Sequence, residues 1–169
     1  LLMDFDCLPD PVDHPIYFPK DLCELRSDEV FVDCGAYDGD TIRLFLRESA
    51  SSFRKIIAFE PDPLNYARLE KSVEALTDGV RERVEIRNAA TGAESTRVRM
   101  EACGGTASAV GGGSLEVDSV ALDDALCDLP VTYLKMDIEG AEMESIQGAR
   151  RLVRECGPVL AICSYHRQG

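Results

Sequence analysis

The stretch VFVDCGAYDGDT, residues 30–41, decides the expected fold of this chain. Its first five residues combine β-branched, aromatic and other apolar side chains, which predicts a short buried strand. Gly35 and Gly39 frame a loop, and apolar residues at a helical spacing follow. A strand, a glycine loop and a helix in this order are typical of the first unit of an α/β domain, where ligands bind at the carboxyl ends of the strands.

Strands and helices alternate along most of the remaining sequence. Asp62 and Pro63 form an N-cap and a first helical position. Strands with little polar character and helices between them predict a doubly wound, mostly parallel sheet of the Rossmann-like α/β class. The further expected strands are residues 55–60, 83–88, 131–137 and 159–166, and the expected helices are 61–76, 121–126 and 141–153.

The segment between the third and fourth of these strands has another pattern. Residues 95–101 and 114–120 alternate apolar and polar side chains. Such alternation predicts half-exposed antiparallel strands, so we expect an added antiparallel pair. Residues 102–113 between them are small and rich in glycine, which predicts a flexible loop.

Length and composition suit one globular domain. We assign it to residues 29–169 and expect residues 1–28, rich in proline and acid, to form an arm packed on it. The formal net charge of −13 argues against nucleic-acid or anionic-membrane partners, which require a positive face. Seven cysteines without a C-x-x-C spacing are typical of a reducing, cytoplasmic protein. No apolar run approaches the ~20 residues of a membrane span, and no signal peptide is visible.

The glycine loop lacks the common phosphate-binding motifs. It reads G-A-Y-D-G, which matches neither G-x-G-x-x-G nor a P-loop. Asp33 before the loop and the acid inside it would repel a diphosphate. They suit a ligand with a cationic part, such as S-adenosylmethionine. Tyr37 either lies over the methionine part of such a ligand or merely covers the loop.

Glu60 ends the second expected strand, roughly 20 residues after Gly39, the spacing at which an acid accepts the hydroxyls of a ribose. The alternative is a charged residue that simply ends a strand. The glycine loop alone is a weak signal, because many turns contain two glycines. The loop, the acid and the strand order together favour an adenosine-containing ligand.

A second acidic group follows the fourth expected strand. Asp137 and Glu139 stand two residues apart, and His166 ends the fifth expected strand. An acid and a histidine at neighbouring strand ends could form a general base with its orienting partner. The same side chains could instead hold a divalent metal, or the acids could only flank a helix N-terminus. We assign no metal.

Several of these stretches resemble the FkbM-type methyltransferases. They are VFVDCGAYDGDTIRLFL, IAFEPDPLNYARLEK, ALDDAL and above all LKMDIEGAEMESIQGA, and the resemblance runs from about Tyr17 to His166. It implies the class I S-adenosylmethionine-dependent methyltransferase fold and methyl transfer to an oxygen of a sugar or natural product. The usual sheet of that fold has seven strands, and no sequence for the last two is visible here.

The resemblance also implies roles for individual residues. Glu60 would hold the ribose, and Asp137 would face the methionine end and the acceptor. The methionine-binding loop would comprise Asp33, Gly35, Ala36 and Gly39, and Asn88 and Ala89 would lie near the adenine.

The sequence therefore leads to an O-methyltransferase that uses S-adenosylmethionine and acts on a small-molecule or glycan acceptor, with a homo-oligomer possible. A non-catalytic module of the same fold, binding the cofactor or a partner protein, is the alternative. A nucleotide-binding oxidoreductase is disfavoured by the spacing and the acids of the loop.

Overall fold

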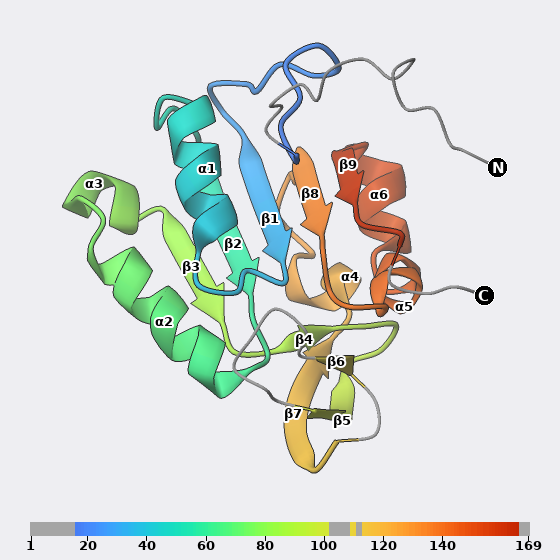
Figure 1. The fold of residues 1–169 in the computed structure, drawn as a ribbon. Coiled ribbons are helices and arrows are strands. Elements are labelled where there is room, and N and C mark those ends of the chain that lie inside the picture. The colour runs from blue at the N-terminus through green and yellow to red at the C-terminus, as the bar shows by residue number, and fades with distance from the viewer. Residues whose placement is uncertain (1–15, 102–108, 111–112, 166–169) are drawn as a thin grey trace, which may run out of the picture.

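The computed structural model describes residues 16–101, 109–110 and 113–165 (Figure 1). Its main sheet has five parallel strands in the order β3-β2-β1-β8-β9. The strand order reverses beside β1, which confirms the doubly wound α/β prediction. The strands are β1 (Val30–Cys34), β2 (Lys55–Phe59), β3 (Val84–Arg87), β8 (Tyr133–Met136) and β9 (Val159–Ile162).

Helices cover both faces of this sheet. α1 and α2 pack on one face, against Phe31 and Ile56, and α4 and α6 pack on the other, against Val32 and Ile57. Successive residues of one strand therefore enter opposite cores, which explains why the strands are apolar on both sides. The helices are α1 (Asp40–Glu48), α2 (Pro63–Glu74), α3 (Asp78–Arg81), α4 (Leu122–Ala125), α5 (Glu142–Gln147) and α6 (Arg150–Cys156).

A second, smaller sheet contains the expected antiparallel pair. Its strands follow the order β4-β7-β5-β6, and β5 pairs with β7 in antiparallel register, as predicted. β4 and β6 were not predicted, because two residues carry no readable period. Figure 1 shows this sheet beyond the arrowheads of β1 and β8, at the edge where a ligand is expected. The strands are β4 (Ala90–Thr91), β5 (Thr96–Glu101), β6 (Ala109–Val110) and β7 (Leu115–Val120).

The start of α2 is fixed by its own sequence. The Asp62 carboxylate accepts hydrogen bonds from the backbone N–H groups of Leu64 and Asn65, and Pro63 is the first helical residue. The predicted cap is therefore confirmed. It sets the path of the chain immediately after Glu60.

Two predicted elements are wrong in extent. The helix expected at 141–153 is two helices, and the break lies at Gly148 and Ala149. There the Gly148 carbonyl oxygen accepts a hydrogen bond from the backbone N–H of Asp123 at 2.7 Å, and the Asp123 carboxylate caps α6 by accepting two backbone N–H groups of its first turn. The fifth strand, expected to reach residue 166, ends at Ile162.

The described part of the arm packs on the domain. Phe18 is only 2% exposed. The centroid of its ring lies 5.3–5.6 Å from the ring centroids of Phe31, Phe45 and Tyr133. Rings at this separation pack favourably in tilted and edge arrangements, so Phe18 anchors the segment that carries Tyr17.

Candidate functional site

A solvent-open cavity of about 760 Å³ lies at the carboxyl ends of β1, β2 and β8. Its wall combines the glycine loop, the end of β2, the segment around β4, the turn after β8 and one arm residue, Tyr17. The cavity therefore lies where a doubly wound sheet is expected to bind its ligand.

The glycine loop makes a tight turn over the end of β1. Gly35 has φ +82° and Gly39 has φ +86°, which favour glycine, and Tyr37 adopts φ +50° between them. A Cβ at Gly35 would lie 2.0 Å from the carbonyl oxygen of Asp137. Gly35 therefore brings β1 and the turn after β8 into backbone contact. Ala36 is fully buried, and neither it nor Gly39 lines the cavity.

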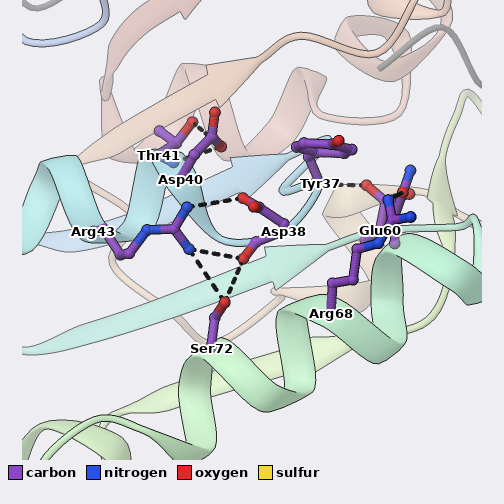
Figure 2. A network of polar contacts seen from close by, with 9 residues as sticks. Tyr37, Asp38, Asp40, Thr41, Arg43, Glu60, Arg68 and Ser72 are labelled. Carbon is purple, nitrogen blue, oxygen red and sulfur yellow. Dashed lines mark hydrogen bonds and ion pairs between the residues drawn. The ribbon is translucent and has the colours of Figure 1, made fainter. Parts of the chain in front are cut away.

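The outer side of this loop is clamped to α2. Ser72 Oγ donates to the Asp38 carbonyl oxygen at 2.6 Å. Arg43 donates to the same carbonyl oxygen, to Ser72 Oγ and to the Asp38 carboxylate, at 3.0–3.2 Å (Figure 2). These bonds hold the left-handed backbone of Tyr37 from the side away from the cavity.

Glu60 faces the cavity with both carboxylate oxygens engaged by backbone. Oε2 accepts from the N–H of Tyr37 at 2.9 Å (Figure 2). Oε1 accepts from the N–H of Asp62 at 3.0 Å. Burial raises the pKa of Glu60 to about 7, although the two backbone N–H groups oppose the shift. Glu60 therefore changes charge near neutral pH.

The two residues expected near the adenine behave differently. Ala89 is buried and lines the cavity. Asn88 is exposed and outside the lining, and its side-chain amide donates to the carbonyl oxygens of Glu60 and Pro61 at 2.8 and 3.2 Å. Asn88 thus fixes the backbone that carries Glu60.

Asp33, expected in the methionine-binding loop, is fully buried beneath it. Its carboxylate pairs with Lys135 Nζ at 2.9 Å, and Lys135 also donates to the Gly35 carbonyl oxygen at 2.7 Å. Desolvation lowers the pKa of Lys135, but the adjacent Asp33 carboxylate raises it above its ordinary value. The charge of Asp33 is therefore balanced inside the protein and does not itself attract a cationic ligand.

The acids after β8 both line the cavity. The chain turns immediately after Asp137, because Glu139 has φ +53° and Gly140 has φ +96°. The two side chains therefore project from a turn and not from one strand face. Asp137 Oδ2 accepts a hydrogen bond from the Tyr17 hydroxyl at 2.6 Å. His166, the third predicted catalytic residue, lies outside the described residues.

Sequence reasoning missed several residues of the wall. Lys135 interrupts an apolar strand, and a lysine there requires a buried partner, so this signal was readable. Asn65, Thr41 and Thr91 are buried polar residues of the lining that no motif marked. Tyr17 lies in the irregular arm, where no periodicity points to the cavity.

In the part of the chain that the structure describes, no three His, Cys, Asp or Glu side chains lie close enough together to hold a metal ion. None of the helices in that part combines the length and apolarity that a membrane crossing requires.

Comparisons with known proteins agree with this architecture. The family model described as "Methyltransferase FkbM domain" matches residues 33–169. A similar solved structure is methyltransferase FkbM from Methylobacillus flagellatus KT, with a TM-score of 0.76 and 29% sequence identity over 89% of this chain. The present chain covers 36% of that protein's chain. No curated protein matches. With its sheet order, its glycine loop and this match in view, the chain belongs to the FkbM methyltransferase family.

Proposed function

We propose that the chain uses S-adenosylmethionine to methylate a hydroxyl oxygen of a small molecule or sugar. The observation that carries the proposal is the Glu60 carboxylate, which lies in the cavity wall at the end of β2. A carboxylate has about four lone-pair positions. The backbone N–H groups of Tyr37 and Asp62 use two of them and the Asn65 side chain bonds a third, which leaves one position for a ribose hydroxyl.

The charges of the cavity fit this cofactor. Among the described lining residues the one cation is Lys135, which Asp33 balances, whereas Asp40, Asp137 and Glu139 add carboxylates. Such a wall repels a diphosphate and favours an ammonium and a sulfonium. S-adenosylmethionine, when bound, supplies a methyl group activated by its sulfonium charge.

The chain's residues divide the work of binding. Glu60 would hold the ribose, and Ala89 would contact the adenine, with Asn88 supporting the backbone beside it. The turn at Gly35 and Tyr37 would hold the methionine part. Asp33 would support this turn indirectly, because it pairs with Lys135, which donates a hydrogen bond to the Gly35 carbonyl oxygen.

The Asp137 carboxylate is the best candidate for the general base. A hydroxyl acceptor must lose its proton as its oxygen takes the methyl group, and we assign that proton to Asp137. Glu139 supplies a second carboxylate on the same turn. His166 remains a candidate orienting partner.

The location and the partners of the protein are also part of this proposal. We propose a cytoplasmic protein with a neutral or cationic small-molecule or glycan acceptor and, because of its net charge of −13, without nucleic-acid or membrane partners. A homo-oligomer is compatible with this function.

Calorimetric titration with S-adenosylhomocysteine, the demethylated product, tests the cofactor site. We expect micromolar binding that weakens at least about tenfold in Glu60→Ala, the loss of one or two hydrogen bonds to a charged group. Glu74→Ala, which removes an exposed acid of α2, is the matched control. No binding by the unaltered chain would contradict the proposal.

An acceptor screen with radiolabelled S-adenosylmethionine tests the chemistry. Asp137→Asn should keep cofactor binding within about tenfold and lose roughly 100-fold or more of methyl transfer, the usual contribution of a general base. Binding without transfer to any hydroxyl acceptor would favour the non-catalytic module instead.

A further inference from the structure

One wall of the cavity comes from outside the matched family domain. The family model begins at residue 33, whereas Tyr17 belongs to the preceding arm. Tyr17 nevertheless lines the cavity together with Lys135 and Asp137. The site is thus assembled from the domain and from a residue of the arm that lies 120 positions before Asp137.

Four contacts hold Tyr17 in this position, one of them a hydrogen bond that its hydroxyl accepts from Cys163 Sγ at 3.8 Å. Its hydroxyl donates to Asp137 Oδ2 at 2.6 Å, and its ring centroid lies 5.2 Å from Lys135 Nζ. Its carbonyl oxygen accepts a hydrogen bond from the Tyr133 hydroxyl. The neighbouring Phe18 is buried in the aromatic cluster, so the Tyr17 backbone cannot move away without exposing a large apolar ring.

We propose that Tyr17 is a positioning residue, which holds the Asp137 carboxylate at the cavity so that the arm completes the site. This inference rests on the proposed function, in which Asp137 faces the methionine end and the acceptor. An O–H···O⁻ bond as short as 2.6 Å is of the strong, charge-assisted kind, and it restricts the rotation of the carboxylate. Burial, together with Asp137, raises the pKa of Tyr17, so the hydroxyl stays protonated and remains a donor.

A double-mutant cycle on S-adenosylhomocysteine affinity tests the inference without an acceptor. The four proteins are the unaltered chain, Tyr17→Phe, Asp137→Ala and the double variant. Tyr17→Phe keeps the ring and removes only the hydroxyl, so the packing of the arm should survive. Ile16→Ala, at an adjacent and 81% exposed side chain, is the matched control.

We expect Tyr17→Phe to weaken binding about fivefold, the size of a typical net hydrogen-bond loss, when Asp137 is present. In the Asp137→Ala background the same change should matter less than about twofold, because nothing remains to be positioned. Ile16→Ala should bind as the unaltered chain does, and thermal unfolding should confirm that every variant is folded.

The outcomes separate the two proposals. If Glu60→Ala abolishes binding but Tyr17→Phe has no effect, or if the effects of Tyr17→Phe and Asp137→Ala simply add, the inference is overturned and the cofactor site stands. If the unaltered chain does not bind, the proposed function fails and this inference fails with it.

Discussion

The Glu60 side and the Asp137 side of the cavity are built in different ways. The Glu60 carboxylate is held by the backbone N–H groups of Tyr37 and Asp62, both within the matched domain. The Asp137 carboxylate is held by the side chain of Tyr17, which precedes that domain. Backbone donors are available whatever the side chains are, whereas a side-chain donor depends on one residue. Under the proposed function, the first side would suit a constant cofactor and the second could vary with the acceptor.

Lys135 lines the cavity and pairs with the buried Asp33 carboxylate, and its replacement should cause the largest loss of stability. Lys135→Met leaves the Asp33 carboxylate buried without its counter-charge, which costs about 3–5 kcal/mol of unfolding free energy. Urea unfolding measures the loss. Lys55→Met is the control, because the Lys55–Glu85 pair is about one-third exposed and should contribute less than about 1 kcal/mol. Equal, small losses in the two variants would contradict a structural role for the buried pair.

Gly35 joins the two sides, and Gly35→Ala should have the next largest effect. The added Cβ would meet the Asp137 carbonyl oxygen at 2.0 Å, and φ +82° is unfavourable for alanine. We expect a loss of about 2–3 kcal/mol or more, seen as a lower melting temperature. At Gly79 a Cβ meets nothing within 4 Å, so Gly79→Ala should be neutral or slightly stabilising. A stable Gly35→Ala variant would refute the close contact.

The charge of Glu60 makes the first side sensitive to pH. Its pKa of about 7 means that the ionised form, the better acceptor of ribose hydroxyls, grows from roughly one-tenth to nine-tenths between about pH 6 and 8. S-adenosylhomocysteine should therefore bind up to about tenfold more tightly across this window. Glu60→Gln should bind weakly and nearly independently of pH. An equally steep pH dependence in Glu60→Gln would assign the titration to another group.

The stability of the protein without ligand should change with pH in the opposite direction. The pKa of Glu60 is raised on folding, so the folded state holds the proton more tightly than the unfolded state does. The Glu60 contribution to stability is therefore present at low pH and is lost as the pH rises from about 4.5 towards 7. Chemical unfolding of the unaltered chain and of Glu60→Gln across this range isolates the contribution.

Removing the hydrogen bonds of Ser72 to Asp38 and Arg43 should have the smallest effect, and it should be seen in cofactor affinity. Ser72→Ala removes the Ser72 bonds to the Asp38 carbonyl oxygen and to Arg43, whereas the bonds from Arg43 to Asp38 remain, so the left-handed Tyr37 backbone becomes only somewhat less well fixed. We expect S-adenosylhomocysteine affinity to fall about threefold and amide hydrogen exchange at Tyr37 and Gly39 to speed up. Ser72→Thr, which keeps the hydroxyl, should restore both. If threonine fails to rescue, the hydroxyl is not what holds the loop.

The sequence predicted the fold around Glu60 well for a local reason. β1, the glycine turn, β2 and the capped start of α2 follow one another, and each is specified by neighbouring residues. Apolar runs, positive-φ glycines and an Asp-Pro cap all leave signals within a few positions. The family resemblance rested partly on this stretch and above all on LKMDIEGAEMESIQGA, farther along the chain.

The Asp137 side was harder to predict because its contacts are distant in sequence. Nothing in a proline-rich arm marks Tyr17 as a partner of Asp137, and 120 positions separate them. The break at Gly148 was also missed, because the contacts made there come from Asp123, which is distant in sequence. The two-residue strand β4, which carries cavity residues, is too short for any period.

A crystal structure of the chain with S-adenosylhomocysteine would test the central claim most directly. The account predicts the ligand in the cavity at the ends of β1, β2 and β8, with its ribose hydroxyls on the Glu60 carboxylate and its sulfur towards Asp137. A ligand bound elsewhere, or one whose ribose does not contact Glu60, would contradict it.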